Sequence, residues 1–233
     1  MLLVNAPKRH EYKYLLTIKD YHELRARLKK VMRLDSFSGE NNGYLVRSLY
    51  FDDPYDTSYH EKVAGVSMRK KYRIRIYNCD QRTIKLEEKI KYIDMVHKNS
   101  CIISQQDVMS ILEGDYSNLL NSSDPFKQYL YVKFISRILK PKVIVDYFRE
   151  AYILPYNRIR VTIDRSLAAG KPSEDFFNKD AITYRTDLMY AFILEVKYDN
   201  FLPDYLKSIL NLYGGTRLAV SKYCLCREVI ESM

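Results

Sequence analysis

Charged and apolar residues alternate with the period of a β-strand in two neighbouring segments, 71–77 and 84–91. Successive side chains of a strand point to opposite faces, so each segment would have one apolar and one charged face. The charged faces carry Lys71, Arg73, Arg75 and Tyr77, then Lys85, Glu87, Lys89 and Lys91. The turn-forming residues 78–81 separate the segments, which predicts an antiparallel hairpin with one cationic face.

This cationic face has two explanations. It could be a solvated outer surface, which is the simpler interpretation for one hairpin taken alone. Like charges side by side on a sheet repel each other, however, so such a face is costly unless carboxylates or a bound anion compensate it. The rest of the chain decides between the two.

The strand pattern recurs along the chain. It predicts further strands at 9–16, 43–51, 141–153, 157–164, 191–198 and 218–225. Their charged faces carry Glu11, Lys13, Tyr147, Arg149, Arg158, Arg160, Glu195, Lys197 and Lys222. Segment 92–103 is mixed, and its Lys98 could continue the basic face.

Helices are predicted between these strands. A capping box at Asp20 and Glu23 opens the first helix. Ser104 and Asp107 open another, which closes at Gly114. The remaining helical segments are a short helix or loop at 55–65, a helix from 124 to about 139, and one at about 203–212.

An antiparallel sheet of seven or eight strands normally curls or closes. If the helices cover its apolar face, the charged faces turn inward. The sequence therefore predicts an α+β fold, an antiparallel β-barrel with helices packed on the outside, as a single domain over residues 1–233. Unpaired buried charges cost several kcal/mol each, so the lumen should be wet and hold a polyanion.

Composition agrees with an anionic partner. The net charge is +9 and the pI is about 9.2, which admits nucleic acid, acidic lipid or polyphosphate. No nucleic-acid-binding motif is present, so no nucleic acid is expected.

The four cysteines lack zinc-ligand spacing. Residues 1–10 are too short in their apolar part for a signal peptide, and no apolar run could span a bilayer, so a cytoplasmic protein is expected.

An ordered set of residues resembles a known family. The set is Glu11 and Lys13, Arg73 and Arg75, Lys85, Glu87 and Lys89, Arg149, Arg160, the run 194–197, and 221–223. It is similar to the catalytic domain of the vacuolar transporter chaperone (VTC) polyphosphate polymerases. That domain belongs to the triphosphate tunnel metalloenzymes, with the CYTH phosphatases and RNA triphosphatases. The resemblance covers about residues 8–228.

The resemblance implies a tunnel that binds ATP and polyphosphate or triphosphate with Mn²⁺ or Mg²⁺. Phosphate or nucleotide would be bound by Lys13, Arg73, Arg75, Lys85, Lys89, Tyr147, Arg149, Arg160 and Lys197. The metal would be bound by Glu195, with Glu87 and Glu11. Ser221, Lys222 and Glu195 would act at the transferred phosphoryl group. The implied reaction moves the γ-phosphoryl of ATP to a growing polyphosphate chain.

Two departures from the family pattern refine this expectation. The hydrolytic members begin Glu-x-Glu-x-Lys, whereas this chain has Arg9-x-Glu11-x-Lys13, which favours the polymerase. The regulatory helical domain and membrane spans of the eukaryotic subunits are missing, which suggests a stand-alone, prokaryote-type domain, peripheral to a membrane at most through a partner. An inorganic triphosphatase and a non-catalytic module that binds polyphosphate or phosphorylated ligands remain open alternatives.

Overall fold

The computed structural model describes residues 9–39, 42–93, 95–188, 190–211 and 220–233. The strands are β1 Arg9–Leu16, β2 Arg33–Leu34, β3 Tyr44–Asp52, β4 Met68–Tyr77, β5 Ile84–Tyr92, β6 Met95–Ile103, β7 Lys140–Leu154, β8 Ile159–Gly170, β9 Tyr184–Arg185 and β10 Phe192–Tyr198. The helices are α1 Ile18–Val31, α2 Thr57–Val63, α3 Gln105–Glu113, α4 Ser117–Leu120, α5 Pro125–Ser136, α6 Asp204–Asn211 and α7 Lys222–Glu231. Short 3₁₀ helices span Ser36–Ser38, Tyr156–Arg158 and Glu174–Phe177.

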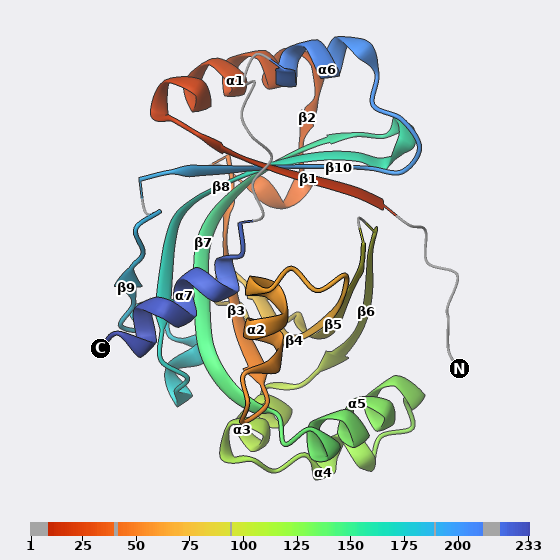
Figure 1. Ribbon diagram of the computed structural model, residues 1–233, viewed down its shortest axis with the longest axis vertical. Helices are drawn as coiled ribbons and strands as arrows, with labels where there is room; N and C mark the ends of the chain where they lie inside the picture. Colours follow the sequence, from red (N-terminus) through yellow and green to blue (C-terminus); the bar gives the residue numbers. More distant parts are fainter. Residues whose placement is uncertain (1–8, 40–41, 94, 189, 212–219) are drawn as a thin grey trace.

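The strands form one antiparallel sheet that curves into a ring (Figure 1). Their order is β2-β7-β3-β4-β5-β6-β1-β10-β8-β9, and an additional pairing of β7 with β8 closes the ring. The β7–β8 pairing is long, from Ile144 opposite Gly170 to Leu154 opposite Ile159. The β6–β1 pairing is short, with only two residue pairs among the described residues. The predicted α+β fold with a curved antiparallel sheet is confirmed.

The β4–β5 hairpin has the two faces that its sequence predicts. Tyr72, Ile74 and Leu86 are fully buried in the apolar cluster that α3, α4 and α5 cover. Arg73 and Arg75, on the opposite face, line the interior cavities of the ring. The hydrophobic effect thus turns the apolar face outward beneath the helices, and the cationic face turns inward.

Two helical groups cover the outside of the ring (Figure 1). The α3–α5 layer covers β4–β6 on one side of the ring. Helices α1 and α6 cover β1, β10 and β8 on the other side, through a cluster that includes Leu24, Leu28, Val161, Leu194 and Leu206. None of the helices in the described ranges is both long and apolar enough to cross a membrane.

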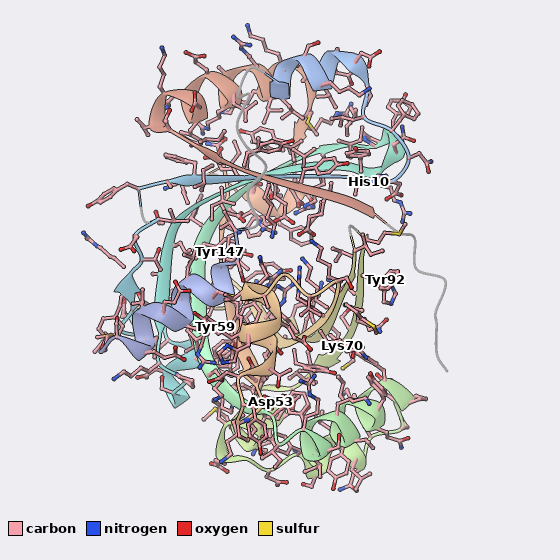
Figure 2. The ribbon with its side chains drawn as sticks, in the orientation of Figure 1. His10, Asp53, Tyr59, Lys70, Tyr92 and Tyr147 are labelled. Atoms are coloured by element: carbon pink, nitrogen blue, oxygen red, sulfur yellow. The ribbon has the colours of Figure 1, made fainter. Side chains whose placement is uncertain are left out.

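Helix α7 packs on the inner face of β7. Its residues Tyr223 and Cys226 share an apolar cluster with Val143, Val145 and Tyr147. Figure 2 shows Tyr147 beside the beginning of α7. The helix therefore fills one part of the ring interior, and the charged part of β7 begins beyond it.

The predicted strand at 218–225 is wrong for residues 220–225, the part of it that the structure describes. Residues 218 and 219 lie outside the described residues, whereas Lys222 begins helix α7, whose N-cap is Ser221. The Ser221 side chain accepts a hydrogen bond from the backbone N–H of Cys224, which stabilises a helix start. The apparent strand alternation in this short segment also fits a helix. The buried residues Tyr223, Cys226 and Arg227 are three and four positions apart, which is helical spacing.

The first helix also begins earlier than predicted. Its N-cap is Thr17, and the capping box joins Thr17 to Asp20 rather than Asp20 to Glu23. The predicted start at Ser104 and end at Gly114 are confirmed, with Gly114 in the left-handed conformation at φ 88°.

Candidate functional site

Two adjoining cavities occupy the interior of the ring. Their volumes are about 930 and 350 Å³. They share a charged stretch, here called the junction, formed by Glu11, Arg73, Arg75, Lys89, Arg149 and Lys197. The strands β1, β4, β5, β7 and β10 each contribute to it, so residues distant in sequence meet there.

Most of the predicted site residues line these cavities. Arg73, Arg75, Lys89, Arg149, Lys197 and Glu11 lie at the junction; Lys13, Tyr147, Glu195, Ser221 and Lys222 line the smaller cavity only; Lys85 and Arg160 line the larger cavity only. Glu87 is not among the lining residues of either cavity.

Arg75 is a buried cation without a carboxylate partner among the described residues. Its side chain donates to Ser48 Oγ at 3.0 Å and Tyr147 Oη at 3.2 Å. It is 8% exposed. Two hydroxyl groups do not neutralise a guanidinium, so this group retains its charge for an anion in the cavity.

Arg73, the neighbouring cation, is held by two partners. Its Nε donates to Glu87 Oε2 at 2.7 Å, and its Nη1 donates to the hydroxyl of Tyr50 at 2.9 Å. Burial favours the neutral phenol of Tyr50, but Arg73, Arg75 and Lys71 outweigh it and lower its pKa to about 7. The field of the cavity is therefore strongly positive at this point.

Glu87 lies in the wall behind Arg73. It is fully buried, and its second oxygen accepts from Lys98 Nζ at 2.7 Å. Although burial would raise the pKa of Glu87, Arg73, Arg75 and Lys98 hold it well below its usual range. This placement favours a role in orienting Arg73 over the predicted role as a metal ligand.

Glu11 and Glu195 form an acidic pair surrounded by lysines. Glu195 Oε1 lies 2.7 Å from Lys197 Nζ, and Glu11 Oε2 lies 3.8 Å from the same nitrogen. Burial opposes ionisation of both groups, but Lys89 and Lys13 lower the pKa of Glu11 to about 2. Lys197, Lys13 and Lys89 hold the pKa of Glu195 well below its usual range. Both carboxylates are therefore ionised at neutral pH.

This acidic pair fits a substrate-completed metal site. Among the described residues, no group of three or more His, Cys, Asp or Glu is placed to hold a metal ion by itself. Mg²⁺ commonly takes only one or two protein carboxylates and completes its shell with phosphate oxygens and water. Glu11 and Glu195 supply such a pair beside the cations that are predicted to bind phosphate.

Asp164 joins two of the predicted functional cations. Its oxygens accept from Arg149 Nε at 2.7 Å and Nη2 at 2.8 Å, and lie 2.7 Å from Lys222 Nζ. Asp164 ends the strand predicted at 157–164, but no role was predicted for it. The alternation along β8 could have indicated a role for Asp164, because it places Asp164 on the same strand face as Arg160.

Lys71 and Tyr50 were also missed as site residues. Lys71 donates to Ser221 Oγ at 3.1 Å, and its ammonium lies 4.4 Å from the ring centre of Tyr223. Its place on the cationic face of β4 was visible in the sequence. Tyr50 gave no such signal, because its role depends on the pairing of β3 with β4, where Tyr50 lies opposite Arg73.

Comparison with known proteins identifies the family. Residues 8–230 match the sequence model of the VTC domain. The chain belongs to the VTC domain family. A direct comparison of this chain with curated proteins found no match. The resemblance expected from the ordered cations and glutamates is confirmed.

Solved structures share the fold of this VTC domain. A candidate adenylate cyclase from Bacillus halodurans is 14% identical, with a TM-score of 0.52 over 91% of this chain and 95% of that chain. A candidate adenylyl cyclase from Hippeastrum, described as having a dominant triphosphatase activity, is 14% identical, with a TM-score of 0.55 over 96% of each chain. These likenesses show the CYTH and triphosphate tunnel fold.

Proposed function

We propose that this VTC domain is a metal-dependent phosphotransferase that moves the γ-phosphoryl group of ATP to the end of an inorganic polyphosphate chain. The observation that carries this proposal is Arg75, a buried guanidinium at the junction whose partners among the described residues are hydroxyl groups. A site that keeps such a charge unpaired is suited to phosphate oxygens, which accept the two parallel bonds of a guanidinium.

The junction residues would hold and orient the phosphates. Arg73 and Arg149 are each fixed by a buried carboxylate, Glu87 and Asp164 respectively, so their guanidinium groups are preorganised. Preorganised cations stabilise charge that develops on a transferring phosphoryl group. Lys89 on β5 and Lys197 on β10 add point charges at the junction.

Glu11 and Glu195 would hold Mn²⁺ or Mg²⁺, and the bound metal would neutralise phosphate charge.

Lys222 and Ser221 lie at the beginning of α7, where the Lys222 ammonium is fixed by Asp164. Their position in the smaller cavity would place them near one end of a bound triphosphate.

The balanced step needs no covalent protein intermediate. A terminal oxygen of the acceptor chain forms a bond to the γ-phosphorus of ATP. The bond from that phosphorus to the β,γ-bridging oxygen breaks, and its electron pair leaves with ADP. The VTC domain would supply alignment and charge neutralisation for this in-line transfer.

An inorganic triphosphatase is the second candidate. The Glu11 and Glu195 pair beside clustered cations would serve metal-dependent attack of water on tripolyphosphate equally well. The difference lies in the acceptor, which is water rather than a phosphate chain.

Incubation of the purified protein with ATP and Mn²⁺ tests both candidates, with polyphosphate resolved on gels and ADP and free phosphate assayed. Growing chains with equimolar ADP, lost in Glu195→Gln and Lys222→Gln, are the expected result. Lys70→Gln is the matched control, because Lys70 lies on the outer face of β4 and contacts Glu88 and Tyr129. Free phosphate without chains would identify the triphosphatase. Absence of turnover would overturn both proposals and leave a binding module.

A further inference from the structure

Tyr50 on β3 has a hydroxyl group whose own proton lacks an acceptor in the described ranges. Its oxygen accepts a hydrogen bond from Arg73 Nη1 at 2.9 Å, and its side chain lines the smaller cavity. The residue is 8% exposed. A buried phenol usually donates its O–H to an acceptor as well. The position of Tyr50 therefore leaves this O–H available to a ligand in the cavity.

Four cations of the smaller cavity act on this hydroxyl group. They are here called the cation group: Arg73, Arg75 and Lys71 on β4, and Lys13 on β1. Strand pairing places Arg73 directly opposite Tyr50. The phenolic oxygen thus lies in a strongly positive field from two different strands.

The other elements packed around Tyr50 present an apolar residue, a lysine, a tyrosine and one carboxylate that is already engaged. Val143 lies opposite Tyr50 on β7, and Lys62 of α2 lines the same cavity. On α7, the ring of Tyr223 lies 5.1 Å from the ring of Tyr50. Asp52 accepts the hydroxyl of Tyr223 at 2.6 Å and also three backbone N–H groups. No side chain among these takes the proton of Tyr50.

Carboxylates compensate the cation group only in part. Arg75 and Lys71 pair with no carboxylate in the part of the chain that the structure describes. The other two members share their carboxylates with further lysines: Glu87 binds Arg73 and Lys98, and Glu11 binds Lys13 and Lys89. A phenol is a weak acid, so Tyr50 is placed to supply additional negative charge.

The cation group changes the ionisation of Tyr50. Burial favours the neutral phenol, but Arg73, Arg75 and Lys71 lower its pKa to about 7. An ordinary tyrosine titrates near a pH of about 10. In the empty cavity at neutral pH, Tyr50 therefore serves as a counter-ion of the cation group.

A phosphate group that enters the cavity would compete with this phenolate for the same cations. The two anions repel each other, so phosphate binding raises the proton affinity of Tyr50. A carboxylate in this place has an ordinary pKa of about 4 and would stay ionised at neutral pH. A phenol can instead take up a proton and then donate its O–H to the phosphate.

We propose that Tyr50 is a phosphate ligand that exchanges its charge for a proton: ionised, it is the counter-ion of the cation group in the empty cavity, and on phosphate binding it takes up one proton from solvent and donates its O–H to a phosphate oxygen. The inference rests on the proposed function in that phosphate is the anion of this site. It concerns binding and does not require turnover.

Near-ultraviolet absorption tests this exchange directly. The chain contains no tryptophan, and tyrosinate absorbs at longer wavelength than neutral tyrosine. The ligand-free protein should show most of one tyrosinate at about pH 7.5, where tyrosines with a pKa of about 10 stay neutral. Saturating tripolyphosphate, which does not absorb in this range, should remove at least about half of the signal.

Two variants assign the signal to a residue. Tyr50→Phe should lack both the tyrosinate band and its loss on addition of tripolyphosphate. Tyr77→Phe is the matched control, because burial favours the neutral phenol of Tyr77 but Arg75 and Lys85 lower its pKa. This control should keep the band that tripolyphosphate removes.

Affinity separates the proposed role from a structural one. Calorimetric titration with tripolyphosphate, without metal, should show affinity falling between about pH 6.5 and 8.5 at least about tenfold more in the wild type than in Tyr50→Phe. The reason is that only the wild type must take up this proton on binding. Loss of a structural hydroxyl would weaken binding equally at both pH values and would contradict the inference.

Three spectral results would also overturn the inference. These are no tyrosinate band at about pH 7.5, a band that saturating tripolyphosphate leaves unchanged, or a band that is lost in Tyr77→Phe and kept in Tyr50→Phe. The first two use the wild type alone, so the test survives a variant that does not fold. The spectral change without polyphosphate synthesis would reject the proposed reaction and keep this inference, and synthesis without the spectral change would do the reverse.

Discussion

The carboxylate of Asp164 on β8 lies 2.7 Å from the ammonium of Lys222, the first residue of α7. The same carboxylate binds Arg149 on β7 through two hydrogen bonds. Asp164 is fully buried, and although burial opposes its ionisation, Arg149 and Lys222 lower its pKa. One acid thus fixes the position of two cations that line the tunnel and connects α7 to the ring.

Replacement of Asp164 by Asn should impair both stability and turnover. It would leave Lys222 without its carboxylate partner and Arg149 with only the more distant Glu195, 3.9 Å away. Loss of such a buried partner typically costs about 3–5 kcal/mol in free energy of unfolding. Urea unfolding monitored by circular dichroism measures this loss. Asp204→Asn is the matched control, because Asp204 is an exposed residue at the start of α6 that pairs with Lys207; it should change stability by less than about 0.5 kcal/mol. An unchanged stability of Asp164→Asn would contradict the prediction.

Arg75→Met should separate stability from binding. In the part of the chain that the structure describes, the guanidinium of Arg75 is bound by hydroxyl groups and by no carboxylate, so its removal relieves an unpaired buried charge. We expect the free energy of unfolding without ligand to stay constant or rise by about 1 kcal/mol. The rise in melting temperature that tripolyphosphate produces in the wild type should be lost, because bound ligand stabilises only the folded state.

Arg75→Lys is the informative companion to that variant. It keeps the charge and loses the planar fork, so tripolyphosphate should stabilise it by an intermediate amount. Full retention of ligand stabilisation in Arg75→Met would show that Arg75 does not bind phosphate.

Glu11 and Glu195, the two acidic groups of the proposed metal site, should behave differently from Glu87, which was also predicted to bind the metal. Mn²⁺ binding in the presence of tripolyphosphate, measured by electron paramagnetic resonance, should be lost in Glu195→Gln and weakened in Glu11→Gln. Glu87→Gln should retain Mn²⁺ binding and lower the free energy of unfolding, since Arg73 and Lys98 lose their shared partner. Loss of Mn²⁺ in Glu87→Gln with normal stability would instead make Glu87 a ligand.

The ligand-free protein should become more stable between about pH 7 and 8.5. Arg73 and Arg75 outweigh burial and lower the pKa of Tyr50 to about 7, and burial lowers the pKa of Lys71 and of Lys89 to about 8. Their unfolded values lie near 10. The unfolded chain therefore binds more protons in this window, so the free energy of unfolding rises with pH, by about 1–2 kcal/mol.

Urea unfolding at pH 7 and 8.5 measures this rise, and Tyr50→Phe should reduce it. Burial raises the pKa of Cys101 to about 12 and also raises the pKa of Cys226. In the unfolded chain these thiols lose their protons above about pH 8.5, so at higher pH they lower the free energy of unfolding and the window ends there. Tripolyphosphate affinity should fall over the same range, since it requires charged lysines. A stability that declines from pH 7 to 8.5 would contradict the assignment.

Local patterns in the sequence determined the faces of the individual strands. Alternation in 71–77 placed Arg73 and Arg75 opposite Tyr72 and Ile74, and the structure has this division. Side chains alternate along any strand, so burial of the apolar half decides which half faces inward. Together with the ordered set of cations, this was sufficient to predict the curved antiparallel sheet, and most of the predicted site residues line its cavities.

Tertiary structure alone decided which charges meet. Glu87 binds Arg73 and Lys98, and Asp164 binds Arg149 and Lys222, through strand pairings that no local pattern specifies. The start of α7 was predicted as a strand because a short run of apolar and polar residues can fit both a strand and a helix. Packing of Tyr223 and Cys226 against β7 selected the helix. Periodicity is a property of neighbours in sequence, whereas the partner of a charge depends on how distant strands come together in the ring.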